Sequence, residues 1–456
     1  MAPSLTEDLI DICTRPVGEA AQNRCAWALL DWCGCAFIGS TAPAGRALAA
    51  LTGQRNLTGR RCFAVGASAQ DAGGAAFLNG GLGNIYEMDD VHRTSILHAG
   101  DVVIPAALAV AQERRISGPD LLKAIAAGYE AALRIGIAAA ANGYSAWYNS
   151  GTCGVFGAAL AAGRVLDLDK PRLADALGQA GMMASGIWQC RLEPTYSKQL
   201  ATAHAARSGV LAAQLAATGF PGALHILEGE LGFFKTYYPA SDPNLVTRDP
   251  EADWQIFDVS FKPWPACRHA HPAIEAALNL RAMHVDRSIS KITVSTYAAA
   301  IDFCDNPRPV SDHEARFSLQ HCVATAFLKG APELNDFGET ARTRSDLAVL
   351  MDKVELHSDD GFTEQFPGYM GARIEIQMAD GTSDNSTVAT AKGDPENPMS
   401  HAELSGKFHK LANAAGISHQ SAKALEEAVH ALPQEPNLTR LDVALEQIAT
   451  ELNAQS

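Results

Sequence analysis

Phe261-Lys-Pro-Trp-Pro-Ala-Cys-Arg-His-Ala-His-Pro272 is the stretch at which the character of the chain changes. It contains one Lys, one Arg and two His but no acidic residue, in a chain whose formal net charge is −15. Proline is tolerated in the first turn of a helix, so Pro272-Ala-Ile-Glu predicts a helix start directly after the cations. Cations beside a helix N-terminus are typical of an anion-binding site, and the alternative is a solvated basic loop. The apolar Trp264 and Cys267 favour the anion site.

The chain before this stretch has a helical pattern that is rich in Ala and Gly. Segments such as Val103-Ile-Pro-Ala-Ala-Leu-Ala-Val-Ala show little of the alternation expected of strands, and Ala disfavours strands. Helical patterning returns from Ser400 to the end of the chain. We therefore expect one large all-helical domain that is built from both chain ends, residues 1–266 and 400–456.

The chain after Pro272 alternates between strand and helix patterns. Residues 291–297 and 372–378 read as strands, and Asp380-Gly381 supplies a turn before a further strand at residues 386–391. Between them, residues 312–330 read as a single helix. This composition predicts a smaller α+β domain over residues 267–399, so the fold class is mainly α.

The overall composition limits the possible partners and the compartment. An acidic chain of 456 residues is a poor partner for nucleic acid, whereas a basic pocket within it suits a small anion. No stretch of about 18 uncharged apolar residues predicts a membrane span. The first residues lack the pattern of a signal peptide, and the ten cysteines are scattered, which favours reduced thiols and a cytoplasmic location.

A second polar cluster is Glu87-Met-Asp-Asp-Val-His-Arg-Thr-Ser-Ile-Leu-His98. Carboxylates and histidines at this density indicate acid–base groups or a metal site. The spacing matches no standard set of metal ligands, so no metal is expected. The structural alternative is that Asp89 or Asp90 caps the following helix.

Two further stretches contain candidate groups. Trp147-Tyr-Asn-Ser-Gly-Thr-Cys-Gly-Val-Phe-Gly157 leads into an Ala-rich helix, and its glycines either admit a substrate to the backbone or serve packing. Lys198 lies at the start of a helix of small residues. A buried Lys needs an anion or a lowered pKa, and the alternative is a Lys that extends to the surface.

These clusters, in this order, resemble the MmgE/PrpD family. The motifs that carry the resemblance are Met88-Asp-Asp with His98-Ala-Gly, Gly151-Thr-Cys-Gly-Val-Phe-Gly, Lys198 with its Ala-rich helix, the stretch from Lys262 to Ile274, and Ala315-Arg-Phe-Ser-Leu319. They cover most of the chain. The resemblance implies an all-helical domain from both chain ends, a smaller α+β lid domain, and a homodimer.

The family's active-site pattern falls on particular residues of this chain. The resemblance implies catalytic roles for Lys198, His98 and His271, and we expect Tyr148 to be catalytic with them. It implies substrate-binding roles for five: Arg268, His269, Glu87, Asp89 and Asp90. Dehydratase-like and decarboxylase-like members carry a His after the aromatic residue that corresponds to Trp147, and Tyr148 stands at that place here.

The tyrosine decides the reaction that we expect from the sequence. Tyr148 and Lys198 have similar pKa values in their ordinary state, which suits removal of a proton from one face of a carbon and its return to the other. This predicts an epimerase without metal or organic cofactor, which acts on a small anionic dicarboxylate such as iminodisuccinate. The alternatives are a hydro-lyase such as 2-methylcitrate dehydratase, a related decarboxylase, and a non-catalytic polycarboxylate-binding protein.

Overall fold

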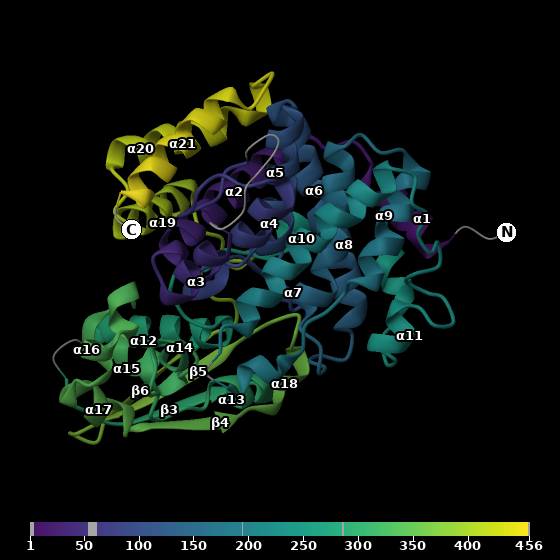
Figure 1. Ribbon diagram of the computed structural model, residues 1–456. Coiled ribbons are helices and arrows are strands. Elements are labelled where there is room, and N and C mark those ends of the chain that lie inside the picture. The colour runs from purple at the N-terminus through teal and green to yellow at the C-terminus, as the bar shows by residue number, and fades with distance from the viewer. Residues whose placement is uncertain (1–3, 53–61, 194, 285–286, 455–456) are drawn as a thin grey trace. The chain divides into compact units, whose positions relative to one another are not determined.

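The computed structural model describes residues 4–52, 62–193, 195–284 and 287–454 (Figure 1). It is mainly helical with a small mixed sheet in the C-terminal part, which confirms the predicted fold class. Contacts within the chain define two compact units. The helical unit comprises the described residues of Met1–Ile85, Asp89–Val259 and Ser400–Ser456, and the mixed unit comprises Tyr86–Met88 and Ser260–Met399. The domain boundaries expected from the sequence stay a prediction.

The helical unit is an assembly of closely packed helices. Its α-helices are α1 (Leu5–Cys13), α2 (Glu19–Ser40), α3 (Pro43–Thr52), α4 (Ala72–Gly80), α5 (Gly100–Arg114), α6 (Gly118–Ala139), α7 (Asn149–Thr152), α8 (Gly154–Val165), α9 (Lys170–Met182), α10 (Ser197–Ala217), α11 (Phe233–Tyr237), α19 (His401–Ala414), α20 (His419–Ala431) and α21 (Thr439–Asn453). The short 3₁₀ helices in it include η2 (Trp188–Arg191), η3 (Pro243–Thr247), η4 (Gln255–Asp258) and η7 (Leu432–Gln434).

Small residues let these helices approach closely. A Cβ on Gly128 of α6 would lie 2.5 Å from Val103 Cγ1 of α5 and 2.8 Å from Ala161 Cβ of α8. A larger side chain at this position would therefore push three helices apart. The Ala and Gly content that predicted a multi-helix core thus has a direct packing role.

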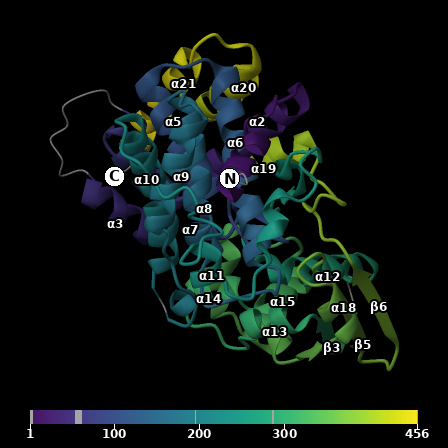
Figure 2. The same cartoon turned by 90° about the vertical axis from the view of Figure 1, so that its right-hand side faces the viewer.

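The C-terminal segment packs against the N-terminal part of the helical unit. Figure 2 shows α19 beside α2, and Lys407 of α19 forms a buried ion pair of 2.6 Å with Asp31 of α2. An unpaired charge at either position would be costly to bury, so the ion pair stabilises the packing of α19 against α2.

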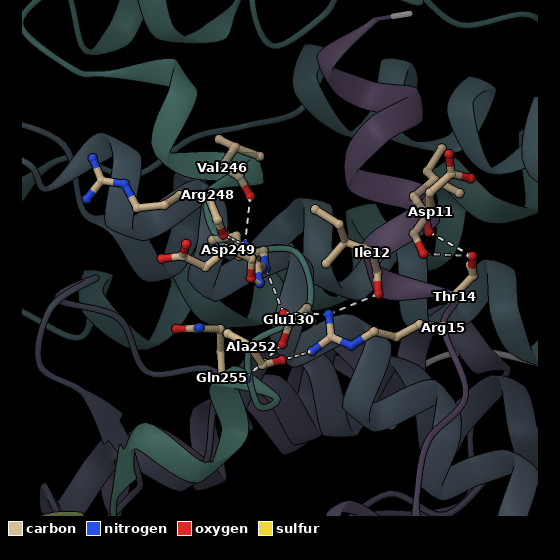
Figure 3. Close-up of polar contacts among 12 residues, drawn as sticks. Asp11, Ile12, Thr14, Arg15, Glu130, Val246, Arg248, Asp249, Ala252 and Gln255 are labelled. Carbon is tan, nitrogen blue, oxygen red and sulfur yellow. Dashed lines mark hydrogen bonds and ion pairs between the residues drawn. The ribbon is translucent and has the colours of Figure 1, made fainter.

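A buried carboxylate anchors a long connection of the helical unit (Figure 3). Glu130 of α6 accepts hydrogen bonds from Arg134 Nε at 2.6 Å, from Arg15 Nη1 at 3.2 Å and from the backbone N–H of Gln255 at 2.8 Å. Arg134 in turn donates to the carbonyl oxygens of Val246 and Arg248. The network satisfies both buried charges and fixes the segment after α11 against α6.

The mixed unit contains a four-stranded sheet with the order β4-β3-β5-β6. Strand β3 pairs in parallel with β4 and antiparallel with β5, which also pairs antiparallel with β6. The α-helices of the mixed unit and the strands of its sheet are, in chain order, α12 (His271–Met283), β3 (Ile289–Thr296), α13 (Ala298–Cys304), α14 (Asp312–Arg316), α15 (Leu319–Lys329), α16 (Glu339–Arg342), α17 (Ser345–Met351), β4 (Val354–Ser358), α18 (Asp360–Gln365), β5 (Ala372–Met378) and β6 (Ser383–Val388). Two short strands are β1 (Val91–His92) in the helical unit and β2 (Val259–Ser260), which spans the boundary between the units.

Three details differ from the sequence-based expectation for this unit. The single helix expected over residues 312–330 is wrong, because the chain breaks at Phe317 and Ser318, and the Ser318 hydroxyl caps α15 by accepting from the N–H of His321 at 3.0 Å. Strand β6 begins three residues before the predicted position, and β4 has no counterpart in the prediction. Strand β5 has the predicted bounds.

Among the described residues, no single helix is long and apolar enough to cross a membrane, although α2 and α3 together pass a test of length and composition as a pair bent by 89°.

Candidate active site

His98 is held in the helical unit by the acidic loop that precedes α5. Its Nδ1 lies 2.6 Å from Asp89 Oδ2 and 3.0 Å from the carbonyl oxygen of Asp90. Both neighbours are acceptors, so Nδ1 carries the hydrogen and Nε2 presents the lone pair. The backbone N–H of His98 donates to Ser150 Oγ at 3.0 Å, which fixes the residue against α7. His98 is therefore arranged to exchange a proton through Nε2.

Asp90 has the capping role that the sequence left open. Its Oδ1 accepts at 3.0 Å from the N–H of Gly100, the first residue of α5, and its Oδ2 accepts from the Tyr129 hydroxyl at 2.7 Å. Burial raises the pKa of Asp90 to about 7, although the Tyr129 hydrogen bond lowers it in part. This carboxyl thus titrates near neutral pH.

Tyr148 precedes α7 and is fully buried. Its N–H donates to the carbonyl oxygen of Gly186 at 3.1 Å, and its ring centroid lies 4.6 Å from that of Trp188. A Cβ on Gly186 would lie 3.6 Å from Tyr148 Cβ and 3.4 Å from Ala201 Cβ in the first turns of α10. Tyr148 is therefore near the beginning of the helix that carries Lys198.

Lys198 is the second residue of α10 and is buried, as expected from the sequence. Its charge lowers the pKa values of Asp101 and Cys190, which burial raises more strongly. Asp89, the partner of His98, acts on the same carboxyl in the opposite direction and raises the pKa of Asp101. Lys198 and Asp89 thus both act on Asp101, and Tyr148 lies near the start of α10, so Lys198, His98 and Tyr148 belong to one region of the helical unit. Their catalytic roles stay predictions.

A cavity adjoins this region. It has a volume of about 480 Å³ and is lined by residues of α10 and of the preceding connection, among them Ser185, Gly186, Cys190, Leu200, Ala201 and His204. Gly186 and Ala201 are also the neighbours of Tyr148 described above. The cavity thus offers space for a small ligand next to the candidate residues.

In the mixed unit, Glu87 is paired with a lysine that the sequence analysis did not select. Lys262 is fully buried, and its Nζ lies 3.2 Å from Glu87 Oε2. Glu87 has a left-handed backbone with φ 54°, which is uncommon for a residue other than glycine. A signal was present in the sequence, since Lys262 stands between Phe261 and Pro263-Trp264, where a lysine side chain has little access to water.

Arg268 forms a buried ion pair with Asp394, which also accepts from Ser260 Oγ at 2.7 Å and from the N–H of Ala391 at 3.0 Å. No acceptor in the described part of the chain hydrogen-bonds to Arg268 Nε or Nη1. The guanidinium is thus fixed by a carboxylate and keeps two donors, so its role in substrate binding stays a prediction.

The two histidines after Arg268 have different surroundings. His269 Nδ1 lies 2.5 Å from the Tyr297 hydroxyl, in a setting of aromatic rings that includes Phe303. His271 is fully buried at the start of α12, and its Nε2 donates to the carbonyl oxygen of Ala266 at 3.1 Å. The substrate-binding role of His269 and the catalytic role of His271 both stay predictions.

Comparison with known proteins identifies the family. The MmgE/PrpD N-terminal domain matches residues 7–246 and the MmgE/PrpD C-terminal domain matches residues 264–434. The chain belongs to the MmgE/PrpD family. It is therefore an enzyme of a family whose members act on small carboxylates.

Three relatives illustrate the distance within the MmgE/PrpD family. The chain is 28% identical over 450 residues to the cis-aconitate decarboxylase-like protein oryM of Aspergillus oryzae, with 92% of each chain covered. It is 26% identical to the cis-aconitate decarboxylase of Aspergillus terreus, with 94% of this chain and 93% of the relative covered. It is 29% identical to the human cis-aconitate decarboxylase, with 75% of this chain and 72% of the relative covered.

Within the described residues, no group of three or more His, Cys, Asp or Glu side chains is arranged to hold a metal ion.

Proposed function

We propose that this enzyme is a cofactor-independent lyase that acts on a small polycarboxylate, with decarboxylation as its reaction. The observation that carries the proposal is the fixed tautomer of His98, whose Nδ1 is held by Asp89 at 2.6 Å in the same region as the buried Lys198. The relatives support the reaction type. The alignments with a cis-aconitate decarboxylase-like protein and with a cis-aconitate decarboxylase each cover more than 90% of this chain.

The reaction needs one proton at carbon. When the bond between carbon and the departing carboxylate breaks, CO₂ leaves and the electron pair stays on the substrate, where a proton must replace CO₂. A protonated Lys198 would supply this proton, and general acid catalysis of this kind contributes roughly 10²–10⁴-fold in rate. Burial of the lysine strengthens its attraction for the substrate's negative charge.

A second candidate is the epimerase expected from the sequence, and Tyr148 favours it. The phenol is fully buried near the start of α10, and a phenol and an ammonium have similar ordinary pKa values. Such a pair would remove a proton from one face of a carbon next to a carboxylate and return one to the other face. A substrate of the iminodisuccinate type would meet this requirement.

Proton NMR in D₂O with three separate substrates distinguishes the reactions. The lyase proposal expects cis-aconitate to lose CO₂ and its product to gain deuterium at one carbon. Exchange of the α-proton of iminodisuccinate with interconversion of its stereoisomers, and no reaction of cis-aconitate, would support the epimerase instead. Formation of an alkene from 2-methylcitrate would indicate a hydro-lyase. A Lys198→Met variant is the control for background reaction, because Lys198 takes part in both the lyase and the epimerase proposal.

A further inference from the structure

A buried tyrosine of the helical unit lies near the candidate residues and has no role in the chemistry described so far. Tyr238 directly follows α11 and is 4% exposed. Its ring packs against Phe233 with the ring centroids 5.3 Å apart, and its hydroxyl contacts two residues of α7. A buried phenol needs partners for its hydroxyl, so the identity of these partners shows which part of the fold the tyrosine holds.

The hydrogen bonds of Tyr238 have a defined direction. Asn149 Nδ2 donates to the carbonyl oxygen of Ser95 at 2.9 Å, so Asn149 Oδ1 is the atom that faces the Tyr238 hydroxyl at 2.9 Å. An amide oxygen only accepts, so Tyr238 donates to it. The Tyr238 oxygen then accepts from Thr152 Oγ1, which is 2.6 Å away. Burial raises the pKa of Tyr238, so the phenol keeps the hydrogen that it donates.

Asn149 connects Tyr238 to the segment that ends at His98. Asn149 is the first residue of α7, and the second residue, Ser150, accepts from the backbone N–H of His98 at 3.0 Å. Two adjacent residues of α7 therefore hold both ends of the segment, the carbonyl oxygen of Ser95 and the N–H of His98. Both side chains are buried, which strengthens these hydrogen bonds and makes their loss costly.

The backbone between these two hydrogen bonds is strained. Ile96 has φ 51°, in the left-handed region that a β-branched residue rarely adopts. Such a conformation persists only where the surrounding contacts enforce it. The backbone pairing of His92 with Leu97, at 2.9 and 3.3 Å, contributes on one side, and the bonds from α7 contribute on the other. Because Ile96 lies two residues before His98, relaxation of this strain would move the backbone of His98.

The same short helix holds the backbone of Tyr148. The Tyr148 carbonyl oxygen accepts from the N–H groups of Gly151 at 2.9 Å and Thr152 at 3.0 Å. Gly151 is closely packed, since a Cβ there would lie 2.3 Å from the carbonyl oxygen of Ser185. Helix α7 thus fixes two of the candidate catalytic residues, Tyr148 and His98, relative to each other.

We propose that Tyr238 is a positioning residue for His98, which acts through Asn149 and keeps the backbone of Ser95–His98 in its strained conformation. Asp89 orients the imidazole ring of His98, whereas Tyr238 fixes the backbone to which the ring is attached. Small displacements of a reacting group lower the rate strongly. The hydrogen bonds are independent of the reaction, whereas their effect on turnover rests on the proposed function.

Two neighbouring tyrosines provide a matched pair of variants. Tyr238→Phe removes the hydroxyl that donates to Asn149 and keeps the ring. Tyr237→Phe is the control, because the Tyr237 hydroxyl donates to the carbonyl oxygen of Ala184 at 3.0 Å and takes no part in the bonds to α7. Each variant therefore loses one hydrogen bond of a phenol, and only one of them affects the segment before His98.

Hydrogen exchange of the His98 amide reports on this segment without turnover. It is followed by NMR in protein with isotope-labelled histidine, and the signal is assigned with His98→Gln. The amide of His409, in the middle of α19, is the internal reference for opening of the whole fold. The kcat and KM of both variants are measured with the substrate that the proton NMR assay identifies.

Tyr238→Phe is expected to raise the exchange rate of the His98 amide by about tenfold relative to Tyr237→Phe, with the His409 amide unchanged. It is also expected to lower kcat by about tenfold at a nearly constant KM, because the position of a reacting group changes and the affinity for substrate does not. Tyr237→Phe should keep kcat within about twofold of the wild-type value.

Equal exchange of the His98 amide in the two variants would overturn the proposal. Faster exchange in Tyr238→Phe at an unchanged kcat would overturn the positioning role as well, because the hydrogen bonds would then stabilise only the fold. A wild-type enzyme that converts none of the three substrates would contradict the proposed function, whereas the exchange rates would still test the hydrogen bonds of Tyr238.

Discussion

At the scale of single residues, the sequence located the candidate groups better than their partners. Asp89, His98 and Lys198 were selected as chemical groups, and the structure adds that Asp89 binds His98. Asp101 was missed, because an isolated aspartate in a sequence gives no sign of burial, and Lys262 was missed although its apolar neighbours in the sequence indicated burial. Their importance depends on neighbours that are distant in the chain, namely Glu87 for Lys262.

Asp90 determines a pH dependence of stability. Its pKa is raised by burial from the ordinary 3.8 to about 7 in the folded state, so its stabilising contribution is complete below pH 3.8 and is lost as pH rises to about 7. Asp90→Asn keeps an acceptor for the N–H of Gly100, and its amide nitrogen can donate to the Tyr129 oxygen in place of accepting from it, so the variant should remove this loss. Urea unfolding between pH 4 and 8 should show that the free energy of unfolding depends less on pH in the variant than in the wild-type protein. The same dependence on pH in both proteins would contradict the assignment.

At the scale of elements, local pattern predicted helices and strand β5, whereas tertiary contacts determined the rest. Residues 312–330 are largely helical as the pattern predicted, yet the chain breaks after α14 and Ser318 caps α15. Strand β6 contains Ser, Asp and Asn, which have low strand propensity, and it forms because it pairs with β5. Strand β4 depends likewise on parallel pairing with β3.

The cap of α15 can be tested directly. Ser318→Ala removes the acceptor for the N–H of His321 and should lower the free energy of unfolding by about 1 kcal/mol. Ser318→Thr, whose hydroxyl can also cap and can donate to the carbonyl oxygen of Asn306 as the serine does, should restore most of the loss in urea unfolding. Equal stability of the wild-type protein and Ser318→Ala would mean that the cap contributes little.

The network of Glu130 holds the connection after α11 to α6. Glu130→Gln leaves the buried Arg134 without its ionic partner, so the free energy of unfolding should fall by about 3–5 kcal/mol. Lys170→Gln is the control, since its pair with Asp11 is exposed and should contribute less than about 1 kcal/mol. Similar losses in the two variants would show that burial does not govern the strength of these pairs.

At the scale of the whole molecule, the division into helical and mixed parts followed from composition, because Ala-rich helices and alternating strands have different patterns. The reaction did not follow, since a single side chain in an active site can change the chemistry without changing the fold. The homodimer implied by the family resemblance stays a prediction, and light scattering during size exclusion should give twice the mass of the chain.

The most direct test is the rate of CO₂ release from cis-aconitate by the wild-type enzyme, Lys198→Met and Tyr148→Phe. The lyase proposal predicts release by the wild-type enzyme, a loss of about 10²–10⁴-fold in Lys198→Met, and a rate within about tenfold of wild type in Tyr148→Phe. Absence of CO₂ from the wild-type enzyme, or an undiminished rate in Lys198→Met, would contradict it.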